Sequence, residues 1–151
     1  MRYLSNKEKR NLEKYLKEKY NIDIKDIDRI SYDEKIKVYF YDKYPIAFER
    51  DEIYPTIYLI SKYQPDMKYV KVNIGAKDKI LNGADIFRPG IIEISEDIKK
   101  GDIVLIISED KKLLGIGKAL YDYEEIIKME KGKVIENIHY YGDKISKLLD
   151  K

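Results

Sequence analysis

Few residues in this chain could carry covalent or metal chemistry. It has no cysteine and a single histidine, His139. The missing thiols exclude disulfides, thiol catalysis and cysteine zinc sites, and one imidazole cannot form a histidine metal cluster. The sequence also lacks the G-x-S-x-G pattern of a hydrolase nucleophile and the GxxxxGK[ST] pattern of a phosphate-binding loop. We therefore expect no catalytic residue, no metal site and no cofactor.

His139 leaves two interpretations open. A single imidazole can be a packed, hydrogen-bonded structural group, or it can contact a base or a phosphate of a nucleic acid. Tyr140 and Tyr141 follow it, and a tyrosine ring can pack inward or stack on a base. Because side chains alternate along a strand, we expect one of these two rings to face inward and the other outward.

The stretch 71–90 combines positive charge with turns of small residues. Its local net charge is +2, from four basic residues against two acidic ones: Lys71, Lys77, Lys79 and Arg88 against Asp78 and Asp85. Gly75-Ala76 precedes a predicted short helix, whose free N–H groups could bind a phosphate that the glycine lets come close. Gly83-Ala84 and Pro89-Gly90 would let another backbone approach. The alternative is a set of ordinary turns with solvated lysines.

The elements that position these residues follow from hydrophobic periodicity and turn signals. Residues 5–8 have the capping-box spacing that begins a helix. Apolar residues alternate at 36–40 and at 46–48, and the turn at 42–45 between them predicts a hairpin. Another short apolar element covers 57–60.

The later part of the chain is predicted to contain short strands separated by turns. The expected strands cover 69–72, 91–94, 103–107, 113–120 and 133–140, with short helices at 76–81 and 123–128 and a final turn or helix within 141–149. Gly115 and Gly117 lie inside an apolar strand, where glycine indicates a bulge or a close backbone approach. Many short strands with little helix favour a small barrel or sandwich.

Composition divides the chain into two parts. Eleven of the 15 tyrosines lie in residues 1–69, whereas six of the eight glycines lie in 75–117 and none precedes Gly75. Residues 62–66 read as a connector, because the residue before a proline is disfavoured in a helix. We predict domains at 1–66 and 67–151.

The overall charge is nearly balanced. The 151 residues include 30 Lys and Arg against 28 Asp and Glu, a net charge of +2. This excludes a diffuse basic tail, but a near-neutral protein can still bind RNA through one basic face. No apolar run is long enough for a membrane helix, and the first residues lack the apolar region of a signal peptide. We expect a cytoplasmic protein that does not bind membranes.

The later part of the chain resembles a PUA domain, named after pseudouridine synthase and archaeosine transglycosylase. The segments that carry this resemblance occur in order: 72–76, 81–86, 88–91, 98–104, 115–119, 132–134 and 139–143. Residues 45–50 and 54–56 resemble the pre-PUA domain that precedes PUA in a subset of archaeal proteins. The same pairing occurs in the eukaryotic "multiple copies in T-cell malignancy" protein and in ligatin.

The resemblance implies an α+β fold, with a small N-terminal α/β pre-PUA domain followed by a PUA pseudo-β-barrel with short helices. It also implies binding to structured RNA, such as the acceptor stem or 3′ end of tRNA or small-subunit ribosomal RNA. Transferred to this chain, with the basic residues above, the RNA-binding residues would be Lys71, Gly75, Ala76, Lys77, Lys79, Asn82, Gly83, Ala84, Arg88, Pro89, Gly90, His139 and Tyr140. Asp85 is expected to be a structural capping residue.

Three functions are compatible with these observations. The first is a non-catalytic RNA-binding protein in translation or tRNA handling, with the small ribosomal subunit or a second translation protein as a partner. The second is an RNA-targeting subunit of a tRNA-modifying enzyme such as a transglycosylase or pseudouridine synthase. The third is a protein-interaction module that docks through the tyrosine-rich first part.

Overall fold

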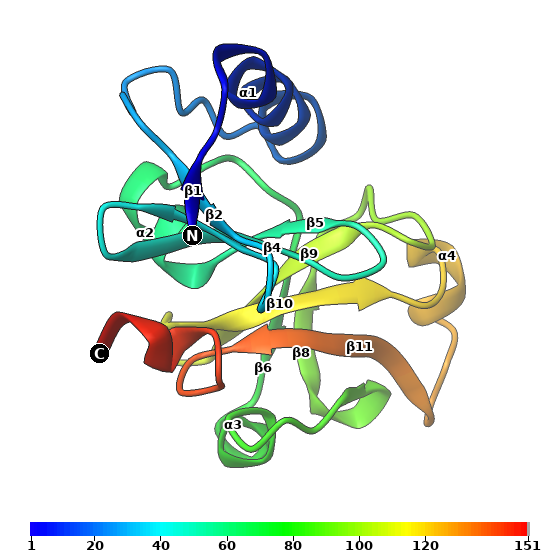
Figure 1. Ribbon diagram of the computed structural model, residues 1–151. Coiled ribbons are helices and arrows are strands. Elements are labelled where there is room, and N and C mark those ends of the chain that lie inside the picture. The colour runs from blue at the N-terminus through cyan, green and yellow to red at the C-terminus, as the bar shows by residue number, and fades with distance from the viewer. Residues whose placement is uncertain (151) are drawn as a thin grey trace. The chain divides into compact units, whose positions relative to one another are not determined.

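The computed structural model describes residues 1–150, which divide into two compact units (Figure 1). Unit 1 consists of Met1–Asp66 together with the segment that begins at Lys144, and unit 2 consists of Met67–Asp143. The expected second domain, 67–151, therefore extends too far. Ile145, Leu148 and Leu149 are partly buried, and the helix that contains the two leucines contacts a strand of unit 1.

Unit 1 is an antiparallel sheet with two α-helices. Its five strands are hydrogen-bonded in chain order. The elements are β1 (Arg2–Tyr3), α1 (Asn6–Tyr20), β2 (Ser31–Asp33), β3 (Val38–Tyr41), β4 (Tyr44–Glu49), β5 (Ile53–Pro55), α2 (Ile57–Tyr63) and the 3₁₀ helix η2 (Ser146–Asp150), which contacts β4.

Local chemistry explains where the helices of unit 1 begin. The Ser5 hydroxyl accepts a hydrogen bond from the Glu8 N–H at 3.1 Å, and the Glu8 carboxylate accepts one from the Ser5 N–H at 2.9 Å. This is the capping box that the sequence predicts. The Thr56 hydroxyl caps α2 in a similar way by accepting from the Leu59 N–H at 3.1 Å. Leu12, Leu16 and Tyr20 form the buried face of α1.

The expected strand at 36–40 begins two residues late, at Val38. The Asp33 carboxylate accepts hydrogen bonds from the N–H groups of Lys35 at 3.0 Å and Ile36 at 3.4 Å, which makes this stretch a turn. Ile36 is 45% exposed as a result. The short strands β1 and β2 have too few residues to show a period-two pattern, and the sequence did not indicate them.

Unit 2 is a mixed, nearly closed sheet with short helices. Its strand order is β7-β11-β10-β9-β6-β8, with β6 parallel to β9 and all other pairs antiparallel. In Figure 1, β9, β10 and β11 run side by side in yellow and orange. The elements are β6 (Tyr69–Val72), α3 (Ile74–Ile80), β7 (Ile86–Phe87), the 3₁₀ helix η1 (Arg88–Gly90), β8 (Ile91–Ile94), β9 (Ile103–Ser108), β10 (Leu113–Ala119), α4 (Tyr123–Ile126) and β11 (Lys133–Tyr140). The expected α+β fold with a PUA-like barrel is confirmed.

The centre of unit 2 depends on two glycines in β10. A Cβ at Gly115 would lie 2.2 Å from the backbone oxygen of His139, and one at Gly117 would lie 2.4 Å from the Ile135 side chain. The register between β10 and β11 shifts between Ile116 and Gly117. The close backbone approach and the bulge predicted from the sequence are therefore both present. They bring the end of β11 close to β10.

Candidate functional site

Helix α3 and the 3₁₀ helix η1 are fastened to each other. The Asn73 side chain caps α3 by accepting from the Ala76 N–H at 2.9 Å, while the Asn73 N–H donates to the Gly90 oxygen at 2.8 Å. A Cβ at Gly90 would lie 3.4 Å from the Ala76 Cβ, which is van der Waals contact. The small residues 75–76 and 90 therefore lie together, although they are distant in the sequence.

The turn after α3 meets the end of β11. Gly83 has φ +94°, a left-handed conformation that glycine adopts without strain, and it lies against the Tyr140 ring. A Cβ there would be 3.3 Å from the Tyr140 hydroxyl oxygen. Helix α3, the turn 81–85, η1 and Tyr140 thus form one part of the surface, which we call the α3 face. Its most exposed predicted residues are Gly75, Lys79, Asn82, Gly83 and Pro89.

Asn137 holds this turn in place, and the sequence did not single it out. Its side-chain amide donates to the carbonyl oxygens of Ile80 at 3.2 Å and Ala84 at 3.0 Å. Its backbone N–H donates to the Asp85 carboxylate at 2.8 Å. Asp85 is therefore a structural residue, as expected. The sequence signals for Asn137 are its type, because asparagine is depleted in strands, and its place in the segment 136–140, which resembles the proteins with both domains.

The beginning of α3 is not the open anion site that the sequence suggested. Asn73 already satisfies the Ala76 N–H, and the Glu109 carboxylate accepts from the Ile74 N–H at 3.1 Å. A phosphate at this position would have to displace a carboxylate. The helix is also only seven residues long, so its dipole is weak. The start of α3 is therefore not an anion-binding group, whereas Gly75 and Ala76 can still let an RNA backbone come close because they are small.

The predicted cations differ in how they are paired. Lys77 lies 3.2 Å from an Asp110 oxygen and Lys71 lies 3.6 Å from a Glu93 oxygen. Within residues 1–150 no carboxylate pairs with Lys79, which is exposed. Ion pairs that are partly exposed contribute little to stability, so Lys71 and Lys77 can exchange a carboxylate for a phosphate at small cost. Lys79 can bind a phosphate without giving up a carboxylate.

The two carboxylates opposite these lysines are held in their charged form. Hydrogen bonds from the Ser108 hydroxyl and, secondly, from Lys77 lower the pKa of Asp110. A hydrogen bond from the Tyr69 hydroxyl, with the charge of Lys71 second, lowers the pKa of Glu93. Both carboxylates are therefore ionised at neutral pH and compete with phosphate for the two lysines.

Arg88 faces a different neighbour from the lysines. Its Nε donates to the carbonyl oxygen of Ile126 at 2.8 Å, and its backbone N–H donates to Gly132 at 2.8 Å. The side chain is thus anchored at α4, while Gly90 of the same 3₁₀ helix lies against α3. Arg88 is a rigid cation at the border of the α3 face.

The structure places His139 inside unit 2, which corrects its assignment as an RNA contact. Its side chain is 1% exposed, and its Nδ1 lies 2.8 Å from the Asp143 carboxylate. The same carboxylate accepts a hydrogen bond from the Tyr140 N–H at 3.1 Å. His139 and Asp143 together fix the chain around Tyr140 and Tyr141. Tyr140 is partly buried and Tyr141 is 67% exposed, so Tyr141 is the more available ring at this end of β11.

The comparisons with known proteins cover both units. A PUA-domain model matches residues 68–141, and a model described as a domain of unknown function (DUF1947) matches residues 2–63. A protein of Methanocaldococcus jannaschii is 39% identical over 137 residues, which are 89% of this chain and 81% of the relative. The chain belongs to the PUA-domain proteins. It is a member that carries the DUF1947 domain in front of PUA, as the resemblance in the sequence indicated.

Two further relatives of this PUA protein span both domains. "Translation machinery-associated protein 20" of Saccharomyces cerevisiae is 35% identical over 125 residues, 78% of this chain and 69% of the yeast protein. A solved structure described as a conserved PUA-domain protein from Thermoplasma acidophilum superposes with a TM-score of 0.85, at 29% identity and 98% coverage of both chains.

Other matches cover a smaller share of the chain. A probable tRNA pseudouridine synthase B of Pyrobaculum arsenaticum is 42% identical over 64 residues, which are 42% of this chain and 19% of that enzyme. A structure of an H/ACA RNP bound to a substrate RNA matches 61% of this chain at 25% identity with a TM-score of 0.51. Membership in the PUA family implies RNA binding.

In the part of the chain that the structure describes, no three carboxylate or imidazole groups converge closely enough to hold a metal ion. None of the described helices is long and apolar enough to span a bilayer.

Proposed function

We propose that this PUA protein is a non-catalytic binder of structured RNA and that it acts in translation or tRNA handling. The observation that carries the proposal is the α3 face, where the small turns at 75–76, 83–84 and 89–90 are held together beside Lys77 and Lys79. Small residues let an RNA backbone come close, and lysines at the same surface supply charge for its phosphates.

This arrangement suits recognition by shape. Structured RNA presents phosphates and 2′-hydroxyl groups in a fixed geometry, and proteins recognise it mainly through these groups rather than through base edges. The α3 face is rigid because Asn73, Asn137 and the left-handed Gly83 fix its turns. A rigid surface loses little conformational entropy when it binds. Tyr140 and the exposed Tyr141 lie where β11 ends beside this surface, and they would contact the RNA there.

The name of the yeast relative supports a setting in translation. Our proposal places the protein in the cytoplasm, with small-subunit RNA or tRNA as the ligand. The local match to a probable tRNA pseudouridine synthase B favours a second candidate, in which the chain directs a tRNA-modifying enzyme to its substrate. Purification of the tagged protein from cells separates the two candidates. Small ribosomal subunits or tRNA alone would support the first, and a tRNA-modifying enzyme in stoichiometric amount would support the second.

The site itself is tested by charge removal. Lys79→Gln should weaken binding to tRNA and reduce the slope of log affinity against log salt by about one unit, as for one lost phosphate contact. Lys99→Gln is the matched control, because Lys99 is exposed in the turn before β9, at the end of the sheet away from α3. Equal effects of the two substitutions would contradict the assignment of the RNA to the α3 face.

A further inference from the structure

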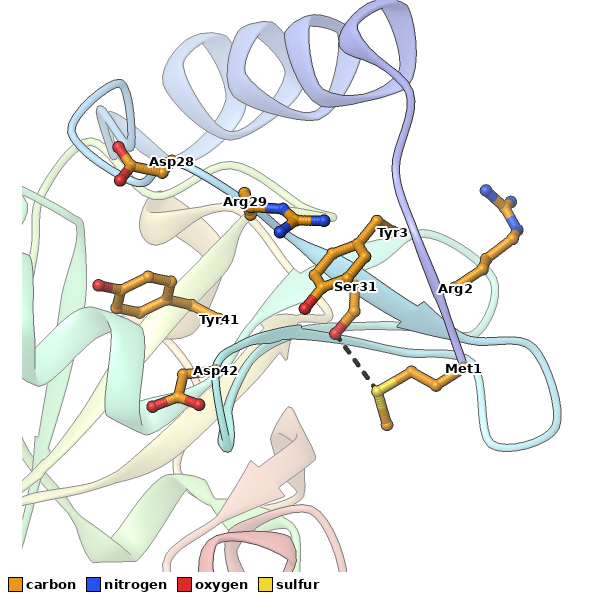
Figure 2. Close-up of a pocket in the computed structure, with 8 residues that line it drawn as sticks. All are labelled: Met1, Arg2, Tyr3, Asp28, Arg29, Ser31, Tyr41 and Asp42. Carbon is orange, nitrogen blue, oxygen red and sulfur yellow. Dashed lines mark hydrogen bonds between the residues drawn. The ribbon is translucent and has the colours of Figure 1, made fainter.

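Unit 1 contains a hollow that the proposed function of unit 2 does not use. Its volume is about 500 Å³, and it is formed by the chain around β1, the segment before β2 and the β3–β4 turn. Figure 2 shows Tyr3 on one side of this hollow, Asp28, Tyr41 and Asp42 on the other, and Arg29 between them. All of these residues belong to unit 1.

The central feature of this hollow is a stacked pair of side chains. The guanidinium carbon of Arg29 lies 3.7 Å from the centroid of the Tyr3 ring, close enough for the flat guanidinium to lie against the ring. Tyr3 is 59% exposed, and Arg29 is also exposed. The Tyr3 ring contacts the guanidinium without a hydrogen bond, so the N–H groups of Arg29 stay available.

Arg29 also differs from its neighbour Arg2 in ion pairing. Arg2 is bound to two carboxylates, Glu8 at 3.0 Å and Glu34 at 2.9 Å. Among the residues that the structure describes, no carboxylate forms an ion pair with Arg29. Among these residues Arg29 is therefore a cation without an ion pair, and it lies on an exposed aromatic ring. Single-stranded nucleic acids bind to this combination, since bases stack on rings and guanidinium planes while phosphates bind cations.

The opposite side of the hollow has complementary groups. Tyr41 supplies a second ring, with the Lys62 amine 5.1 Å from its centroid. Asp28 and Asp42 are exposed carboxylates, and carboxylates accept hydrogen bonds from the amino groups of bases. They also repel phosphate. This places a base near the aspartates and its phosphate near Arg29.

We propose that this hollow binds one unpaired nucleotide of a single-stranded RNA, with its base stacked on the Arg29–Tyr3 pair and its amino group directed to Asp28 or Asp42. The proposal goes beyond the binding of structured RNA by unit 2. It gives the tyrosine-rich domain of unknown function an RNA contact of its own. Uracil carries no amino group, so the site should prefer cytosine to uracil.

The test uses the full chain and two fluorescent RNA probes, the single strands C8 and U8, in anisotropy titrations. The native protein should bind C8 more tightly than U8. Tyr3→Leu should weaken C8 binding about tenfold without changing the salt slope, because stacking is lost and charge is kept. Tyr3→Phe keeps the ring and should bind like the native protein.

Arg29 has two informative substitutions and a matched control. Arg29→Gln should weaken C8 binding and lower the salt slope by about 0.7, the value for one phosphate on a single strand. Arg29→Lys should keep the slope and still lose affinity, because an ammonium does not stack. Arg10→Gln removes the same charge from the exposed side of α1 and should have no effect.

Several results would overturn the proposal. They are equal affinity for C8 and U8, unchanged C8 binding in Tyr3→Leu and Arg29→Gln, and equal losses in Arg29→Gln and Arg10→Gln. If the Arg29–Tyr3 pair has a purely structural role, Tyr3→Leu and Arg29→Gln will lower the melting temperature and leave the affinity for RNA unchanged. Lys79→Gln, which tests unit 2, should weaken tRNA binding and leave C8 binding intact, so the failure of one proposal is distinguishable from the failure of the other.

Discussion

Substitution of Gly115 by alanine should damage unit 2 more than any other glycine-to-alanine change in the α3–β11 region. A Cβ at this position would lie 2.2 Å from the His139 oxygen and 2.9 Å from the Tyr140 Cα, both backbone atoms that cannot rotate away. Because Cβ contacts under 3.0 Å essentially do not occur, β10 and β11 must separate by about 0.8 Å.

The separation of β10 from β11 costs free energy in two ways. The Tyr141 N–H donates to the Leu114 oxygen at 2.8 Å beside Gly115, and an opening of about 0.8 Å stretches this bond beyond the useful range. Loss of a hydrogen bond costs about 1 kcal/mol, and overpacking of a core adds about 2 kcal/mol. The sum of about 3 kcal/mol should lower the melting temperature of a unit of this size by roughly 12 °C or more.

The assay is thermal unfolding followed by circular dichroism, with Gly75→Ala as the matched control. A Cβ at Gly75 would lie 3.5 Å from Asn73, an ordinary contact, and alanine favours a helix more than glycine does. Gly75→Ala should therefore melt at or slightly above the native temperature. Below its melting point, Gly115→Ala should also bind tRNA more weakly, because His139 and Tyr140 move. A Gly115→Ala protein that melts within about 2 °C of the native one would refute the reasoning.

Three further predictions concern the supports of the two units. Asn137→Ala removes two side-chain hydrogen bonds to the turn after α3 and should cost about 2 kcal/mol, with faster amide exchange at 81–85; unchanged exchange would contradict the role of Asn137. Asp143→Ala removes the acceptor of His139 and of the Tyr140 N–H and should destabilise unit 2 by about 2 kcal/mol in urea, whereas Tyr141→Ala should be nearly neutral for stability. Hydrogen bonds from Arg2 and the Ser5 N–H lower the pKa of Glu8 to about 2. The folded pKa lies below the unfolded one, so the support of Glu8 for α1 is complete above about pH 4.5 and is lost as the pH falls toward 2. Amide exchange at the start of α1 should show this pH dependence in the native protein and not in Glu8→Gln.

The sequence predicted most elements whose signals are local. The capping box at Ser5, the strand at 133–140 and the glycine approach at Gly115 each depend on residue types at fixed spacing, and all three are present. Strands β1 and β2 were missed because two or three residues carry no readable alternation. Ile36 was misplaced because the Asp33 carboxylate organises a turn that the hydrophobic pattern does not show.

The candidate site was predictable only where its signals are local. The small turns of the α3 face follow from Gly and Pro in the sequence, but whether they meet depends on contacts between distant segments, such as Asn73 with Gly90. The burial of His139 could not be predicted from the sequence, because an imidazole is compatible with both the buried and the exposed face of a strand. The occupied helix start was also invisible, since Glu109 lies 35 residues away from the Ile74 N–H.

The division of unit 1 into two stretches of chain has a consequence for synthesis. Residues 67–143 make up the whole of unit 2, and the segment with η2, which contacts β4, follows them. Domains generally fold as units while the chain is made from its N-terminus. Unit 2 can therefore complete its sheet first, while unit 1, although residues 1–66 are made earlier, has to wait for residues 144–150. Of the two units, unit 1 is thus the second to be finished.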